Sequence, residues 1–172
     1  MSPLYYTGIG SRETPDEILS LMTEIAVWLQ RRGYRLRSGG APGADTAFEI
    51  GAGSDADIYL PWRAFNGKVG LVITGNVEDE ARAIAEAHHP AWGRCSPAAR
   101  KLHTRNVPQV LGSHLRSPSA FVACWTKDGG PTGGTGQALR IAAAFGVPIF
   151  NLCHPDAALR LRMHVQPEGV FA

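Results

Sequence analysis

Glycine-rich segments stand at three points of the sequence where an apolar run gives way to a helical pattern. They read "TGIGSRETP" (7–15), "RSGGAPGADTAFE" (37–49) and "DGGPTGGTGQALR" (128–140). Glycine lets the backbone approach a ligand closely and adopt positive φ. A helix N-terminus behind it presents unpaired N–H groups and a partial positive charge. One such segment is typical of a plain strand-to-helix turn, but three of them favour a shared crevice for a phosphate or a ribose.

Several residues of these segments, and of two others, are expected to face the ligand. Arg12 is a candidate phosphate clamp, because a guanidinium pairs with phosphate through two hydrogen bonds. Arg105 and Asn106 lie before Pro108, near a helix end. The full predicted set is Gly8, Gly10, Ser11, Arg12, Ser38, Gly39, Gly40, Gly43, Asp45, Arg105, Asn106, Trp125, Thr126, Gly133, Gly134, Thr135, Gly136 and Gln137.

Asp45 and Glu49 are the candidate catalytic residues. They stand four residues apart on a predicted helix, so both carboxylates can face the same way. Such a pair can supply a general base for glycosidic chemistry. Two alternatives stay open: the pair forms a solvated helix face, or Asp45 serves a ribose hydroxyl or the helix dipole.

Established cofactor motifs are missing. There is no GxxxxGK[ST] phosphate loop, and "GIGSRE" lacks the third glycine of a dinucleotide fingerprint. The second predicted strand ends in Arg37, Ser38 and Gly39, where an NAD-binding fold carries an acidic residue. His88, His89 and His103 lack metal-ligand spacing. We therefore expect no cofactor and no metal, and a structural role for the histidines.

Strand and helix patterns alternate along the chain. Apolar runs at 4–9, 34–40, 56–61, 119–126 and 147–152 predict strands, and helical patterns at 14–33, 43–53, 77–89, 96–112 and 135–146 predict helices. The run at 69–74 fits either a strand or a buried loop, and Pro108 is expected to kink or end its helix. This alternation predicts an α/β fold, a single-domain Rossmann-like three-layer sandwich with a mostly parallel sheet. Residues 4–152 form its core, and 153–172 are peripheral.

The three glycine segments together resemble one family. "SGGAPGADTAFEIGA" is similar to a segment of the DNA-processing protein A (DprA/Smf) family, and "YYTGIGSRETP" and "GGTGQALRIAAAFGVPIFNL" resemble the other ligand-facing loops of the SLOG superfamily. That superfamily also contains the Lonely Guy (LOG) phosphoribohydrolases and nucleotide-sensing domains of bacterial defence systems. The segments "RKLHTRNVPQVLG" and "FVACWTKDG" look most like small stand-alone DprA-like proteins often carried by phages.

The resemblance implies three functions. The first is binding of a nucleotide or a nucleotide-derived signal, to sense or sequester it, which for a phage protein would act against host defence. The second is LOG-like release of a base from a nucleotide, although the glutamate of that mechanism falls on Arg140 and Glu49 replaces the usual DprA-like histidine. The third and weakest is single-stranded DNA binding, with Arg31, Arg32, Arg35, Arg37, Arg94, Arg100, Lys101 and Arg105 as a basic surface. Self-association is also implied.

Composition limits the class of protein. The 172 residues are 44% hydrophobic and 19% charged, which is typical of one globular domain. A net charge of +2 is too small to indicate nucleic-acid binding. Cys95, Cys124 and Cys153 show no disulfide or zinc pattern. With no secretory signal and no apolar run near the ~20 residues of a membrane span, we expect a soluble cytoplasmic protein without membrane partners.

Overall fold

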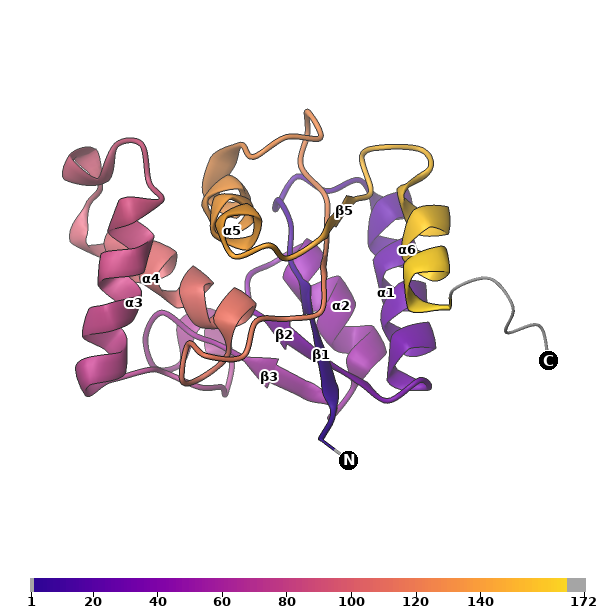
Figure 1. Cartoon of the computed structure of the whole chain (residues 1–172), viewed down its shortest axis with the longest axis horizontal. Coiled ribbons are helices and arrows are strands. Elements are labelled where there is room, and N and C mark those ends of the chain that lie inside the picture. Colours follow the sequence, from indigo (N-terminus) through magenta and orange to yellow (C-terminus); the bar gives the residue numbers. More distant parts are fainter. Residues whose placement is uncertain (1, 167–172) are drawn as a thin grey trace.

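A computed structural model describes residues 2–166. Five parallel strands form one sheet (Figure 1). The strands are β1 (Leu4–Gly8), β2 (Tyr34–Ser38), β3 (Ala56–Ile58), β4 (Val122–Cys124) and β5 (Ile149–Asn151). The α-helices are α1 (Asp16–Gln30), α2 (Ala44–Ala52), α3 (Gly75–Ala87), α4 (Pro97–Leu111), α5 (Gly133–Ala144) and α6 (Ala157–Val165), with 3-10 turns at Phe65–Gly67 and Trp92–Arg94.

The sheet has the strand order β3-β2-β1-β4-β5. The chain therefore first builds outward from β1 through β2 to β3, then returns to the other side of β1 with β4 and β5. The order reverses between β1 and β4, and in open α/β sheets the ligand crevice lies beyond the carboxyl ends of the strands at such a point. Thr7 pairs with Val122 and Gly8 with Ala123 at this junction.

Helices cover both faces of the sheet, which confirms the predicted three-layer α/β architecture. One apolar cluster joins the sheet to α1, α2 and α6, with Tyr6, Phe48 and Phe121 fully buried in it. A second cluster joins the opposite face to α3, α4 and α5, around Val122 and Ile141. Figure 1 shows α1 and α6 together at one end and α3 and α4 at the other. No helix among residues 2–166 is long and apolar enough to cross a bilayer.

The C-terminal part of the described chain contributes to the core. Ala157 and Leu161 of α6 are fully buried in the cluster that contains α1. The Arg162 guanidinium lies 5.8 Å from the centre of the Trp28 ring on α1. The expected peripheral segment 153–172 is thus partly a packed helix, and its last residues, 167–172, lie outside the described part.

The structure refines three local predictions. The helix α1 begins at Asp16, two residues after the predicted start at position 14, and the Thr14 hydroxyl donates to Ser11 O at 2.6 Å. Pro108 does not end α4, which continues to Leu111 with residues 104–111 all buried against the rest of the fold. The run 69–74 is neither strand nor buried: it makes one bridge, between Tyr59 and Leu71, and Val69 is 97% exposed.

Candidate ligand-binding crevice

A crevice of about 530 Å³ opens at the carboxyl ends of β1 and β4. It lies at the reversal of strand order, and all three glycine segments reach it, together with α4. Its lining residues are Ile9, Gly10, Ser11, Arg12, Glu13, Ala41, Asp45, Ala99, Leu102, His103, Arg105, Asn106, Gln109, Thr126, Lys127, Thr132, Gly133, Gly134, Thr135 and Ala138. The structure thus brings together ten of the predicted site residues: Gly10, Ser11, Arg12, Asp45, Arg105, Asn106, Thr126, Gly133, Gly134 and Thr135.

The N-terminus of α5 forms one wall of the crevice. The helix begins at Gly133, and Thr132 makes no side-chain capping bond there. The first N–H groups of a helix have no partner within it, so the amides of Gly133, Gly134 and Thr135 are open to an acceptor. A Cβ on Gly134 would meet no atom within 4 Å. Packing therefore does not require glycine at this position, whereas close approach of a ligand would.

Arg12 stands on the β1–α1 loop at the rim. Its side chain is exposed, and within residues 2–166 it makes no ion pair. The loop itself is fixed to the neighbouring strand, because Ser11 N–H donates to Trp125 O at 3.1 Å. Arg12 is thus a free cation on a positioned backbone, facing the same cavity as the α5 N-terminus.

Asp45 and Arg105 are the buried charges of the crevice floor. Asp45 is 5% exposed and accepts from Ala41 N–H at 3.2 Å, and Arg105 is 8% exposed. Burial raises the pKa of the Asp45 carboxyl to about 6, against the opposing effect of the Arg105 guanidinium and of backbone amides. Arg105 donates from Nη1 to the carbonyls of Gly39 and, at 3.2 Å, Tyr59. Asp45 therefore changes charge at mildly acidic pH, while Arg105 is anchored to the ends of β2 and β3.

Asn106 links α4 to the third glycine segment. Its amide nitrogen donates to Gly134 O at 3.2 Å and to Gln137 Oε1 at 3.0 Å. Its amide oxygen accepts from Gln109 Nε2 at 2.9 Å. On the opposite wall, the Thr126 hydroxyl donates to Gly130 O at 2.8 Å. Asn106 and Thr126 therefore shape the segment that carries α5, and both also line the cavity.

Other predicted glycines and Ser38 lie below the crevice and serve the fold. A Cβ on Gly8 would come within 2.6 Å of the Phe48 ring, and one on Gly39 within 2.7 Å of Arg105 Nη1. Gly40 and Gly43 adopt φ of +70° and +85°, which other residues rarely adopt. Ser38 is fully buried and donates its hydroxyl to Gly8 O at 2.6 Å. These residues support the crevice without lining it.

Trp125, Gly136 and Gln137 are also placed away from the crevice lining. The Trp125 side chain is 9% exposed and belongs to the cluster with α1, so it does not offer a stacking surface. A Cβ on Gly136 would stand 2.3 Å from the Pro131 carbonyl. Gln137 is fully buried, and its Nε2 donates to Ala85 O on α3 at 3.0 Å. Their positions are explained by packing.

The predicted carboxylate pair is split. Asp45 lines the crevice, but Glu49 forms an ion pair with Lys68 and is not part of the lining. The reason is that α2 directs its N-terminus at the crevice, so a residue one turn later lies about 6 Å further along the axis. Arg140 does not line the crevice either: it donates to His88 O at 2.9 Å and to Pro131 O at 3.0 Å.

Several lining residues were not predicted as ligand-facing. His103 and Gln109 lie on the same helix as Arg105 and Asn106, and Lys127 directly follows Thr126. Residues three or four apart share a helix face. His103 and Gln109 each lie three residues from Asn106, and this spacing could have indicated that they face the crevice with it. Ala99 and Leu102 extend the same face with apolar surface.

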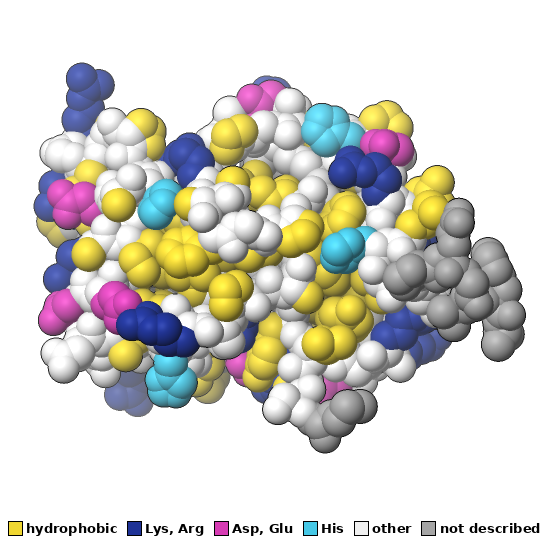
Figure 2. All heavy atoms as spheres, viewed as in Figure 1, with side chains coloured by type: hydrophobic (Ala, Val, Ile, Leu, Met, Phe, Trp, Pro, Cys, Tyr) yellow, Lys and Arg dark blue, Asp and Glu magenta, His cyan; other side chains and the backbone are white. Residues whose placement is uncertain are grey.

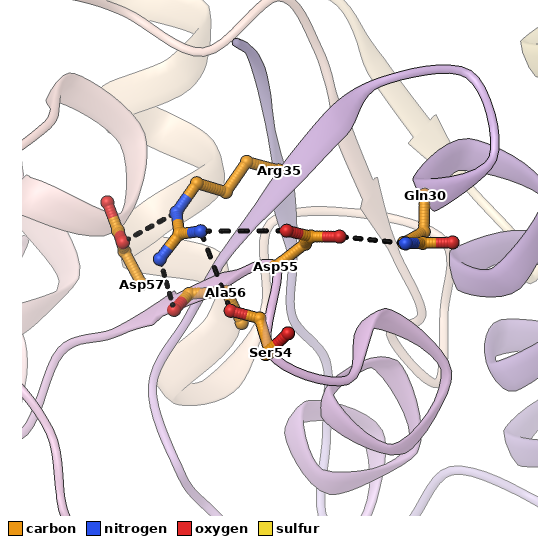
Figure 3. A network of polar contacts seen from close by, with 6 residues as sticks. All are labelled: Gln30, Arg35, Ser54, Asp55, Ala56 and Asp57. Atoms are coloured by element: carbon orange, nitrogen blue, oxygen red, sulfur yellow. Dashed lines mark hydrogen bonds and ion pairs between the residues drawn. The ribbon is translucent and has the colours of Figure 1, made fainter.

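The basic residues proposed as a nucleic-acid surface are dispersed. On the face in Figure 2, lysine and arginine side chains are separated around the periphery and alternate with acidic ones. Arg37 and Arg105 are 3% and 8% exposed. Arg35 donates to Asp57 Oδ1 at 2.9 Å and lies 3.8 Å from Asp55 Oδ1, in the network of Figure 3. Of the eight predicted residues, Arg37 and Arg105 are thus buried and Arg35 is ion-paired within the protein.

The fold and the crevice define a Rossmann-like protein with a DprA-like arrangement of sheet and helices. No family model and no curated protein matches the sequence. Among solved structures, DNA processing protein A from Helicobacter pylori, described with a single-stranded DNA binding mode, matches with a TM-score of 0.52. The alignment covers 99% of this chain and 77% of that chain at 17% sequence identity, so the likeness concerns the fold.

Proposed function

We propose that this protein binds a nucleotide or a nucleotide-derived signalling molecule in the crevice between β1 and β4. The observation that carries the proposal is the α5 N-terminus, where backbone N–H groups are open to the cavity and where packing does not require a glycine at Gly134. The volume of about 530 Å³ lies in the usual range for small-molecule pockets.

A phosphate group fits the rim of the crevice. The amides of Gly133, Gly134 and Thr135 offer donors, and the helix dipole favours an anion there. Arg12, free of ion pairs among the described residues, supplies the opposite charge and two parallel hydrogen-bond donors. Together they would hold a phosphate between the first and third glycine segments.

The floor of the crevice is suited to a sugar. Asp45 can accept a hydrogen bond from a ribose hydroxyl when ionised, and its pKa of about 6 makes it ionised at neutral pH. Leu102, Ala99 and Ala138 offer apolar surface for a base. The same carboxyl is the only one of the two predicted catalytic groups at the cavity, so base release, if it occurs, would depend on Asp45 and not on Glu49.

Isothermal titration calorimetry with a panel of nucleoside monophosphates, cyclic nucleotides and cyclic ADP-ribose variants tests this function. We expect one member to bind with a Kd well below 1 mM, and the matching nucleoside without phosphate to bind at least about tenfold more weakly. Chromatography of the same mixtures detects released base. Absence of sub-millimolar binding across the panel would overturn the proposal.

Single-stranded DNA binding is a second candidate, favoured by the structural likeness to DNA processing protein A. A mixed-sequence oligonucleotide in a gel-shift titration at two salt concentrations distinguishes it. Binding that weakens steeply with salt would support a nucleic-acid surface, and retention of that binding in Arg12→Ala would place it outside the crevice. The dispersed arginines lead us to expect no such steep dependence.

A further inference from the structure

Two histidines and a cysteine converge beside the crevice. His89 follows α3, Cys95 follows the 3-10 turn, and His103 lies on α4; their candidate ligand atoms all lie within 4.8 Å of one another. The sequence spacing predicted a structural role for the histidines. It could not show this cluster, because the three residues come together only when α4 packs against the end of α3. We propose that His89, Cys95 and His103 bind a zinc ion, independently of the nucleotide.

The ligand types suit zinc. A borderline-soft divalent ion prefers thiolate sulfur and imidazole nitrogen, and Zn²⁺ binds both. Zn–S and Zn–N bonds of ~2.3 Å and ~2.0 Å at tetrahedral angles place sulfur and nitrogen about 3.6 Å apart. In the structure, Cys95 Sγ lies 3.9 Å from His89 Nδ1 and 3.6 Å from Nε2. The cysteine and the histidine are therefore already near coordination distance.

The tautomer of His89 identifies its metal ligand. Ala91 N–H donates to His89 Nδ1 at 3.0 Å, so Nδ1 carries the lone pair, which accepts this bond, and Nε2 carries the proton of the neutral ring. We assign the zinc bond to Nδ1. Binding replaces the Ala91 hydrogen bond, and it therefore requires a small rearrangement of the turn between residues 89 and 95. The partial exposure of this turn permits such a movement.

His103 supplies the third ligand from a rigid element. The two imidazole rings have centroids 4.4 Å apart. The Nδ1 atom of His103 is buried and has no hydrogen-bond partner within the described residues. A buried ring nitrogen without a hydrogen-bond partner is unfavourable, so the Nδ1 atom of His103 is available for a metal bond.

Three protein ligands leave one tetrahedral position for water or another molecule, as in open zinc sites. His103 is the ligand that also lines the nucleotide crevice. The zinc site is therefore a neighbour of the crevice, with one shared residue, and its occupancy can be measured without any nucleotide.

Cobalt substitution tests the site on the intact protein. The chelator-treated chain is titrated with Co²⁺ and followed by absorption spectroscopy. We expect a sulfur-to-cobalt charge-transfer band that saturates at about one equivalent and is displaced by Zn²⁺. Cys95→Ser should abolish the band and weaken zinc binding roughly 100-fold. His89→Gln should weaken it too, whereas the control variants Cys153→Ser and His88→Gln should bind like wild type.

X-ray absorption spectroscopy of the zinc-loaded wild type gives a test that needs no variant. We expect one sulfur at ~2.3 Å and imidazole nitrogens at ~2.0 Å from the metal. A zinc shell without sulfur, or no charge-transfer band in wild type, overturns the proposal. So does a band that persists in Cys95→Ser. Nucleotide binding by a protein that binds no zinc would leave the proposed function intact and remove only the metal site.

Discussion

Lys68 holds Glu49 in an ion pair outside the crevice, while Asp45, on the turn of α2 before it, lines the cavity. Both partners are partly exposed, at 23% and 25% of their side-chain surface. The pair thus neutralises one of the two carboxylates that the sequence offered for chemistry. The helix α2 thus directs Asp45 to the crevice and Glu49, one turn later, to Lys68 on a neighbouring loop.

Glu49→Gln should leave ligand affinity and any release of base unchanged within about twofold, because Glu49 does not reach the cavity. The free energy of unfolding of this variant should fall by less than about 1 kcal/mol, as is usual when a partly exposed ion pair is removed. Calorimetry with the best nucleotide and urea unfolding measure the two quantities. Lys68→Met serves as the matched control, and a large loss of affinity in Glu49→Gln alone would contradict the assignment.

Asp45 should make stability depend on pH. Burial raises its pKa from 3.8 to about 6 in the folded state, so the folded chain binds the extra proton. Stability from this group is fully present below pH ~4 and is lost as the pH rises through about 6. Asp45→Asn removes that dependence. We expect the unfolding free energy of the variant, relative to wild type, to rise by up to roughly 3 kcal/mol across this window.

Urea unfolding of wild type and Asp45→Asn at several pH values between 4 and 7 measures this difference. Other titrating groups are shared by the two proteins and cancel in the comparison. If the difference in unfolding free energy between the two proteins stayed constant with pH, the pKa of the Asp45 carboxyl would not be raised in the folded state.

Gly134 and Gly136 should respond oppositely to alanine. In Gly134→Ala the new Cβ stands in open space, so the free energy of unfolding should be unchanged or rise by up to about 1 kcal/mol. Nucleotide affinity should fall at least about tenfold, because the methyl group crowds the helix N-terminus. In Gly136→Ala the Cβ would stand 2.3 Å from the Pro131 carbonyl, which should cost about 1–3 kcal/mol.

Thermal unfolding and calorimetry separate these effects on two neighbouring glycines of α5. If Gly134→Ala bound the nucleotide as tightly as wild type, the phosphate would not lie at the α5 N-terminus. Unchanged stability in Gly136→Ala would show that the Pro131 carbonyl can move away from the new Cβ at little cost in free energy.

Arg12→Ala should weaken binding of the phosphorylated ligand roughly 10- to 100-fold, through loss of ~1.5–3 kcal/mol of charged hydrogen bonds. Binding of the unphosphorylated nucleoside should weaken much less in the same variant. Stability should stay within about 0.5 kcal/mol of wild type, because Arg12 is exposed. The exposed Arg63, which does not line the crevice, gives the control Arg63→Ala. Equal losses for nucleotide and nucleoside would argue against a phosphate contact.

The layered α/β architecture and the location of the crevice could be predicted from the sequence. Alternating apolar runs and helical patterns depend on local periodicity, and glycine at the strand ends depends on local backbone conformation. Both signals can be read without knowing which segments meet. Strand ends of a parallel sheet share one edge, so the three glycine segments were predictable as neighbours.

Which side chains enter the crevice depends on long-range packing and could not be predicted from the sequence. Glu49 forms an ion pair with Lys68, and Gln137 donates a hydrogen bond to Ala85 O. Trp125 packs in the apolar core. In each case the partner lies on another segment of the chain. The same holds for His89, Cys95 and His103, which no spacing rule connects. Local sequence fixes backbone direction, but a side chain's partner and its burial come from long-range packing, which a pattern in one segment does not contain.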